Sequence, residues 1–338
     1  MVKKLNVAYL GFGKSANRYH IPYVQTRENL NIARVVSPHL GKRPEQATLE
    51  ASGTVFSTDH SDIINDSNID LVDIVTPAAS HYDLAKKFLK AGKHVLCDKP
   101  LVEHLDQAKE LVNIASEKGL FFMPFQNRRF DSDFLTVKKV LETGYLGKLN
   151  DITVHMDHYR PTDLTKGGSY FDGAWYGHGV HLVDQMISLF GRPKDVQYDI
   201  RNTRDGATDD YFSVNLIYDG LRATVAASET SALPHPKWTL YGDRGTFIKN
   251  QVDQQENDLK AGIMPGREGF GLDSPADYGK LVYFNQNGDR IEKSIPTLAG
   301  DYARVYDSVY ETIINSAAKL VSDEELLAVI EILEKGFR

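Results

Sequence analysis

The first 125 residues alternate short apolar runs with longer stretches in which apolar residues recur at helical spacing. This alternation is typical of a parallel sheet whose strands are joined by crossover helices. The helical stretches end at Gly92 and Gly119, and a further helix over 132–143 ends at Gly144, each glycine suited to the left-handed cap of a helix. The predicted strands cover residues 5–10, 32–36, 71–76, 94–97 and 120–125.

A different pattern begins after about residue 148, where short apolar runs are joined by tight-turn signals. The runs 213–218 and 221–227 are joined by Asp219-Gly220, a pair that readily forms a two-residue hairpin turn. Similar signals recur at 242–245 and 287–288. The pattern predicts a mostly antiparallel sheet over residues 149–295. One inserted helix is predicted over 173–190, closing helices over 302–319 and 322–334, and a functional or interface loop over 250–278.

The length of 338 residues exceeds what one hydrophobic core usually organises. We therefore expect an α/β protein with an N-terminal Rossmann dinucleotide-binding domain over residues 1–125. A C-terminal α+β domain over 126–338 carries the large, mostly antiparallel sheet and serves substrate binding and oligomerisation.

Composition and charge exclude several classes of protein. The 41% hydrophobic and 25% charged residues are ordinary for a globular protein, and the net charge of −7 argues against nucleic-acid binding. The one cysteine, Cys97, cannot form an internal disulfide, and no apolar run reaches the ~18 residues of a membrane span. We expect a cytoplasmic protein that contacts neither nucleic acid nor membrane.

The run Gly11-Phe12-Gly13-Lys14-Ser15-Ala16 follows the first predicted strand and should open a helix. In that context Gly11 allows a tight turn and Gly13 lets the backbone approach a pyrophosphate, which the helix N-terminus stabilises. The alternative is an ordinary glycine-rich turn in a protein that binds no nucleotide. The motif favours a dinucleotide.

The end of the second predicted strand bears on the choice between NAD and NADP. No Asp or Glu follows it to hold a ribose 2′-hydroxyl; Ser37 stands there, and Lys42 and Arg43 come soon after. A missing acid with nearby cations suits the 2′-phosphate of NADP, although the two cations are equally compatible with a solvated loop. We expect NADP, with NAD as the alternative.

Lys99 and His181 are candidates for the chemistry of hydride transfer. Loss of a hydroxyl proton needs a base and a group that stabilises the developing alkoxide. Lys99 follows a strand that ends at the carboxyl edge of the parallel sheet, where ligands bind in open α/β folds, and an imidazole such as that of His181 titrates near neutrality.

Four motifs in order resemble the Gfo/Idh/MocA oxidoreductases: the glycine-rich run, Asp98-Lys99-Pro100, the run 126–131 and the run 179–184. The resemblance covers nearly the whole chain and is strongest to a branch with NADP-dependent scyllo-inositol dehydrogenases and uncharacterised bacterial oxidoreductases. It implies an open-faced sheet after the Rossmann domain, a cis Lys99-Pro100 peptide, and catalysis by Lys99 and His181. It places the nicotinamide beside Lys99, adds Thr76, Pro77, His81, Asn127 and Arg128 beside the cofactor, and gives Asn127, Arg160, Tyr176, Asp184 and Tyr302 as substrate contacts.

The resemblance implies a nicotinamide-dependent dehydrogenase or reductase acting on a ring hydroxyl or ketone of a sugar or inositol-like polyol. One departure matters, because Gly177 stands where many members carry an Asp one helical turn before the histidine. It keeps open two alternatives: a dinucleotide-binding sensor without turnover, and a glycosidase that oxidises transiently. His178 and His181 have no clear third ligand, so no metal site is expected. A sheet with one uncovered face predicts a homodimer or homotetramer.

Overall fold

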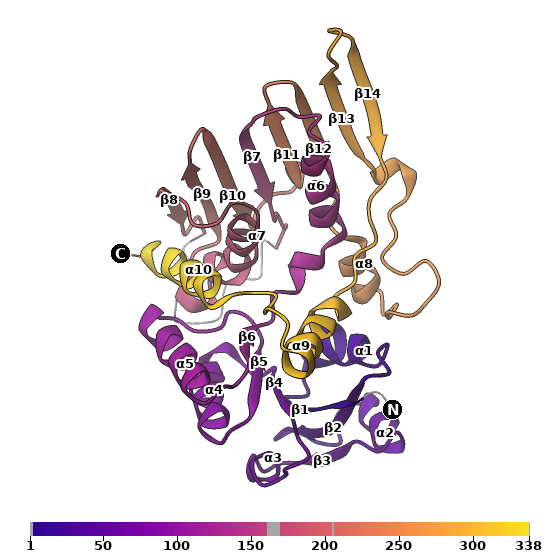
Figure 1. Ribbon diagram of the computed structural model, residues 1–338, viewed down its shortest axis with the longest axis vertical. Helices are drawn as coiled ribbons and strands as arrows, with labels where there is room; N and C mark the ends of the chain where they lie inside the picture. Colours follow the sequence, from indigo (N-terminus) through magenta and orange to yellow (C-terminus); the bar gives the residue numbers. More distant parts are fainter. Residues whose placement is uncertain (1–2, 161–169, 205, 338) are drawn as a thin grey trace. The chain divides into compact units, whose positions relative to one another are not determined.

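The computed structural model describes residues 3–160, 170–204 and 206–337 (Figure 1). Two compact units make up the chain. Unit 1 contains Met1–Asn127, Met264–Arg267 and Tyr302–Leu327, and unit 2 contains Arg128–Ile263, Glu268–Asp301 and Ala328–Arg338.

The division differs from the predicted one in the closing segment, which the sequence assigned to the second domain. Side chains of that segment bond to the first unit: the Tyr310 hydroxyl donates to the carbonyl of Lys3 at 2.8 Å, and Asp307 forms an ion pair with Arg27 at 2.8 Å. The residues in these two contacts are about 300 positions apart in the chain, so no local pattern in the sequence indicates them.

Unit 1 is built on a six-stranded parallel sheet in the order β3-β2-β1-β4-β5-β6, which is the Rossmann order. β1 and β4 are buried almost throughout, as expected of strands covered on both faces. The five predicted strands are all present, whereas β3 was not predicted because it has three residues and Val55 is half-exposed. The strands are β1 (Leu5–Leu10), β2 (Leu30–Val36), β3 (Val55–Ser57), β4 (Leu71–Ile74), β5 (His94–Cys97) and β6 (Phe122–Pro124).

The helices of unit 1 connect these strands. α4 and α5 lie beside each other, as do α1 and α9 (Figure 1). Their bounds are η1 (Ala16–His20), α1 (Ile21–Val24), α2 (Glu45–Ala51), α3 (Ser61–Ile64), η2 (Ala78–Ser80), α4 (His81–Lys90), α5 (Leu105–Glu117) and α9 (Ala303–Asn315). α10 (Asp323–Lys335) begins in unit 1 and ends in unit 2.

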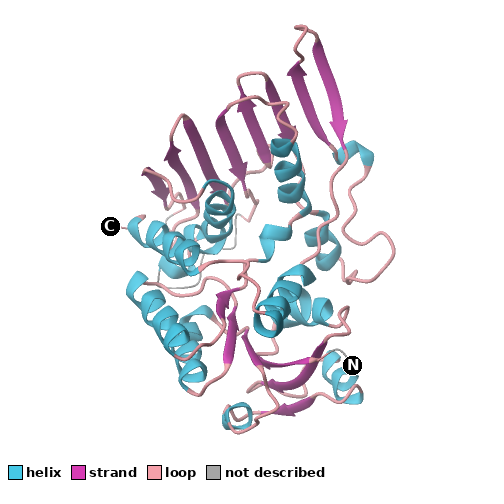
Figure 2. Ribbon diagram, viewed as in Figure 1, coloured by secondary structure: helices cyan, strands magenta, loops and turns pink. Residues whose placement is uncertain are grey.

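Unit 2 contains an eight-stranded sheet in the order β14-β13-β12-β11-β7-β10-β9-β8, visible as the row of magenta arrows in Figure 2. All neighbours are antiparallel except β7 and β10, which confirms a mostly antiparallel sheet. Hairpins occur at all three predicted turns. The strands are β7 (Leu149–His155), β8 (Asp195–Arg201), β9 (Tyr211–Tyr218), β10 (Leu221–Ser228), β11 (Trp238–Gly242), β12 (Gly245–Lys249), β13 (Gly279–Phe284) and β14 (Arg290–Ile295).

Helices cover one face of this sheet. On α6, Phe134 stacks on Trp238 of β11 at 5.9 Å, and Asp133 accepts a hydrogen bond from the Trp238 indole at 2.8 Å. The opposite face carries a row of half-buried polar residues, among them Thr153 and Thr224. The helices are η3 (Asn127–Phe130, which starts at the unit boundary), α6 (Ser132–Glu142), η4 (Tyr170–Asp172), η5 (Trp175–Gly179), α7 (Val180–Phe190), α8 (Gln254–Lys260) and η6 (Pro275–Asp277).

The predicted inserted helix is present as η5 followed directly by α7, and the expected loop over 250–278 contains α8 and η6. Of the helices that the structure describes, none combines the length and the apolar character needed to cross a bilayer.

Candidate active site

Gly11 joins the carboxyl ends of three strands of unit 1. It follows β1 directly, and its N–H donates to the carbonyl of Val36 at the end of β2 at 2.9 Å. Its φ is +100°, and a Cβ there would lie 2.6 Å from the carbonyl oxygen of Val75, just past β4. Only glycine fits this turn without strain, because both the conformation and the close approach exclude a side chain.

A pocket of about 740 Å³ opens at these strand ends. Its volume lies within the range of small-molecule and cofactor sites, and it occupies the crevice where the strand order reverses between β1 and β4. Gly13 is exposed, and a Cβ there would meet no heavy atom of the described residues within 4 Å. The pocket brings together eight of the predicted cofactor residues: Gly11, Phe12, Gly13, Ser37, Lys42, Arg43, Thr76 and Pro77.

The end of the pocket near β2 carries charges of both signs. Lys42 and Arg43 line it, as a 2′-phosphate requires, but so does Glu45, the first residue of α2. Ser37 is buried, and its N–H donates to the carbonyl of Ser57 at 3.0 Å. These residues fit a dinucleotide with or without a 2′-phosphate.

Asp98, beside the candidate lysine, fixes the backbone of Lys99. One carboxylate oxygen accepts the Lys99 N–H at 2.8 Å and the other accepts the Ser15 hydroxyl at 2.7 Å. Burial raises the pKa of Asp98, but the hydrogen bond and charge of His20, together with the charge of Lys99, hold that pKa well below its usual range. The Lys99-Pro100 peptide is cis, as the resemblance implied. Ser15 therefore supports Asp98 and is not part of the pocket lining given above.

Sequence reasoning missed His20, which is fully buried between two carboxylates. Its Nδ1 lies 3.2 Å from Asp73 and 2.8 Å from the Tyr306 hydroxyl, and its Nε2 lies 3.6 Å from Asp98. Burial lowers the pKa of His20, but the charge and hydrogen bond of Asp73, with those of Asp98, outweigh it and raise the pKa to about 9. The ring also stacks on Phe125 at 3.9 Å. A histidine five residues after Ser15 gives no signal of this role, because its partners come from distant strands and from α9.

His81 ties the Thr76 turn to the lysine segment. One ring nitrogen lies 2.8 Å from the carbonyl of Thr76 and the other 2.9 Å from the carbonyl of Pro100. It is buried and positions two loops instead of lining the pocket. Lys14 is exposed on the turn after Gly13.

In unit 2, His181 and Asp184 lie on α7, and both are buried. Arg129 binds Asp184 in bidentate fashion, with two nitrogens each 2.8 Å from a carboxylate oxygen. Such a pair fixes the helix that carries His181. The predicted contact of Asp184 with substrate stays a prediction beside this pairing with Arg129.

A second polar cluster surrounds Glu229, which follows β10. Its carboxylate accepts hydrogen bonds from His178 at 2.7 Å and from Arg160 at 3.2 Å, and His158 lies 3.8 Å away. Burial together with the charges of His178 and Arg160 lowers the pKa of His158 to about 4. Glu229 and His158 were not predicted, because they meet only through the parallel pairing of β7 with β10.

The remaining predicted residues have varied surroundings. Tyr176 is fully buried against Phe171, and Tyr302, in unit 1, is fully buried with its ring 5.3 Å from that of Tyr23. Asn127 is also buried and ends the first segment of unit 1. Arg128, in unit 2, donates to Glu256 at 2.7 Å and to Asp131 at 3.2 Å. These ion pairs already occupy a side chain that was predicted to contact the cofactor.

Gly177, the departure from the expected carboxylate, lies in η5 one turn before His181. A Cβ at this position would meet no heavy atom within 4 Å among the described residues. Packing against the described part of the chain therefore does not require glycine at this position.

Comparisons with known proteins agree with this architecture. The chain matches the model of an oxidoreductase family with an NAD-binding Rossmann fold over residues 5–126 and the model of that family's C-terminal alpha/beta domain over 138–338. It is 46% identical to the uncharacterized oxidoreductase YhhX of Escherichia coli, covering 98% of this chain and 96% of YhhX. It is 32% identical to the scyllo-inositol 2-dehydrogenase (NADP+) IolW of Bacillus subtilis, covering 98% and 93%.

Solved structures give the same result. A crystal structure of an oxidoreductase from Bacillus cereus superposes with a TM-score of 0.95 at 49% identity, covering 99% of this chain and 96% of that one.

Proposed function

Because the chain belongs to the Gfo/Idh/MocA oxidoreductase family, we propose that it transfers a hydride between a nicotinamide dinucleotide and a CH–OH carbon of a sugar or inositol-like polyol. The observation that carries the proposal is in unit 1. There the glycine turn and the pocket share the carboxyl edge of one sheet with Lys99, whose backbone Asp98 holds.

In this mechanism the dinucleotide, when bound, supplies the hydride acceptor. His181 removes the hydroxyl proton, and the Lys99 ammonium donates a hydrogen bond to the same oxygen and stabilises its developing negative charge. Arg129 keeps α7 in position through Asp184, and Asp98 keeps the Lys99 backbone in position. In the direction of reduction His181 returns the proton to the ketone oxygen, while Lys99 keeps its hydrogen bond to that oxygen.

We propose NADP as the preferred cofactor. Lys42 and Arg43 line the pocket where a 2′-phosphate needs cations, and the relative IolW is named for NADP. Glu45 in the same lining is the group that favours NAD instead.

A polyol is the substrate class that the polar groups of unit 2 favour. The Glu229 cluster offers a carboxylate, a guanidinium and two imidazoles, which together donate and accept hydrogen bonds as adjacent hydroxyls require. The name of IolW points to a cyclic polyol.

The test is a fluorescence titration with NADPH and NADH, followed by a screen of polyols, sugars and the matching ketones with the preferred cofactor. Lys99→Met and His181→Asn are expected to lower kcat by roughly 10²–10⁴-fold while each variant still binds the cofactor. His104→Asn, an exposed histidine of unit 1, is the matched control. If no compound changes the nicotinamide absorbance, the proposal fails.

Two other activities give different results in the same experiment. Gly177 is the feature that favours a sensor without turnover. Such a protein binds cofactor without turning it over, and its Lys99→Met variant behaves like the wild type. A glycosidase releases an aglycone with no net reduction of the cofactor.

We further propose a homodimer or homotetramer that associates through the open face of the unit 2 sheet. Tyr241 and Phe284 are 46% and 52% exposed there, and strand alternation puts both on the side of Thr153. Sedimentation of the wild type and of a variant with Tyr241→Lys and Phe284→Lys tests this association. The wild type should sediment as an oligomer and the variant as a smaller species; a monomeric wild type contradicts the proposal.

A further inference from the structure

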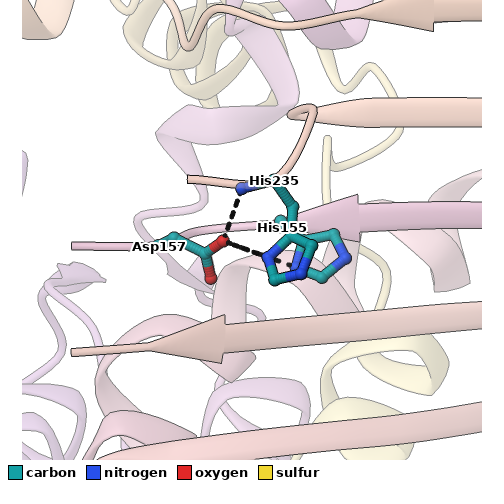
Figure 3. Close-up of side chains that lie close together, drawn as sticks. All are labelled: His155, Asp157 and His235. Atoms are coloured by element: carbon teal, nitrogen blue, oxygen red, sulfur yellow. Dashed lines mark hydrogen bonds and ion pairs between the residues drawn. The ribbon is translucent and has the colours of Figure 1, made fainter. Parts of the chain in front are cut away.

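Two histidines and one aspartate meet in unit 2 where β7 ends and β11 begins, outside the residues already discussed. His155 is the last residue of β7, Asp157 follows two residues later on the same face, and His235 precedes β11, the antiparallel neighbour of β7. Figure 3 shows both rings beside the carboxylate of Asp157. The His235 Nδ1 lies 2.8 Å from one Asp157 oxygen, and the His155 Nδ1 lies 3.7 Å from the same oxygen.

We propose that His155, Asp157 and His235 bind one divalent transition-metal ion, with Zn²⁺ as the ion the donors suit best. Two imidazole nitrogens and one carboxylate oxygen are a frequent ligand set for zinc. Donors about 2.1 Å from a tetrahedral ion lie about 3.4 Å apart. The Asp157 oxygen lies 2.8 Å from the His235 Nδ1 and 3.7 Å from the His155 Nδ1, one distance below and one above that spacing. All three donor atoms lie within 4.8 Å of one another.

The carboxylate is held in advance of any ion. Its side chain is 1% exposed, and it accepts the backbone N–H groups of Ser228 at 3.1 Å and of His235 at 3.0 Å. The backbone of His155 is held as well, because its backbone N–H donates to the carbonyl of Lys237 at 3.0 Å. Bonds of this kind orient metal ligands and raise site affinity.

The cluster also has an unsatisfied donor atom and an entry path. Among the described residues, the buried Nδ1 of His155 has no hydrogen-bond partner. The rings of His155 and His235 are stacked at 4.3 Å with an angle of 18°, so one ring must turn for both lone pairs to meet at an ion. The His235 side chain is 61% exposed and has room to do so. Three protein donors leave a fourth position for water, as in open zinc sites.

The second His–His–carboxylate cluster, around Glu229, fits an ion less well. Glu229 already forms ion pairs with Arg160 and His178, and a fixed guanidinium beside the carboxylate opposes a cation. At the proposed site the described structure gives Asp157 no Lys or Arg within ion-pair distance.

The test is calorimetric titration of the full, untagged chain with Zn²⁺ after chelator treatment, in the absence of cofactor. We expect the wild type to bind Zn²⁺ tightly, and His235→Gln and His155→Gln each to bind one ion fewer or at least ~100-fold more weakly. His104→Gln is the matched control and keeps full binding. Mg²⁺ does not compete, since it prefers oxygen ligands.

Replacing Zn²⁺ with Co²⁺ gives a second readout, because tetrahedral nitrogen and oxygen ligation produces a visible absorption band that His235→Gln abolishes. His235 is exposed, so the variant retains the fold, which the tryptophan emission checks. A wild type without tight Zn²⁺ binding overturns the proposal, and so do equal stoichiometry and affinity in the two variants. The titration involves no dinucleotide, so its outcome is independent of the proposed dehydrogenase activity.

Discussion

The buried His20 should make the stability of unit 1 depend on pH. Burial opposes its charge, yet Asp73 and Asp98 raise its pKa to about 9 from the ordinary 6.5. Because the pKa is higher in the folded state, the folded protein binds this proton more tightly than the unfolded chain does. The resulting stabilisation is complete below about pH 6.5 and is lost as the pH rises through about 9. At 1.36 kcal/mol per pKa unit the full contribution is about 3 kcal/mol, of which about 2 kcal/mol disappears between pH 7 and pH 9.

The chain offers a separate probe for each unit. Cys97, the one cysteine, is fully buried on β5 in unit 1, so its reaction with a thiol reagent in a short pulse reports opening of that unit. Both tryptophans, Trp175 and Trp238, lie in unit 2. Urea titrations at pH 7, 8 and 9 should shift the Cys97 labelling midpoint to lower urea as the pH rises, and shift the tryptophan transition much less.

The variant His20→Gln removes the titrating group. Its unit 1 should be less stable than that of the wild type at pH 7, and most of its pH dependence over this range should vanish, while His104→Gln keeps the wild-type slope. The reasoning is refuted if wild type and His20→Gln lose the same free energy between pH 7 and pH 9.

Four further outcomes follow from the geometry. Gly11→Ala should lower the free energy of unfolding by about 2–4 kcal/mol and abolish NADPH binding, measured by urea titration and fluorescence, because its Cβ meets a backbone carbonyl at 2.6 Å. Replacing Lys42 and Arg43 by Gln should weaken NADPH far more than NADH; equal losses contradict a 2′-phosphate site. Gly177→Asp should change stability by less than about 0.5 kcal/mol yet alter KM for the polyol, with Gly177→Ala as control. Trp238→Phe should cost about 1–3 kcal/mol in urea unfolding, because it removes a buried donor from a carboxylate.

The sequence predicts best what local chemistry determines. The apolar runs of unit 1 mark five of its strands, and Asp219-Gly220 marks the hairpin between β9 and β10. Gly11 is identified because a tight turn after a strand needs glycine, and its φ of +100° agrees. These features depend on neighbours along the chain.

Groups brought together by distant elements were not predicted. His20 has no distinctive local sequence, and its partner Tyr306 is 286 residues away. Glu229 meets His178 across 51 residues, through a sheet order that alternation alone does not specify. The polar surroundings of a candidate base therefore remain the least predictable part of such a site.

The chain passes between the two units more than once, and this affects how the protein can be divided. A fragment that stops at Asn127 contains every strand of the Rossmann sheet but lacks α9. It would lose the Tyr306 hydroxyl, which donates to Asp73 at 2.6 Å, and so remove one hydrogen-bond donor from a buried carboxylate. Expressing the nucleotide-binding half alone, or grafting it onto another partner, therefore requires carrying α9 along as a separate or permuted segment.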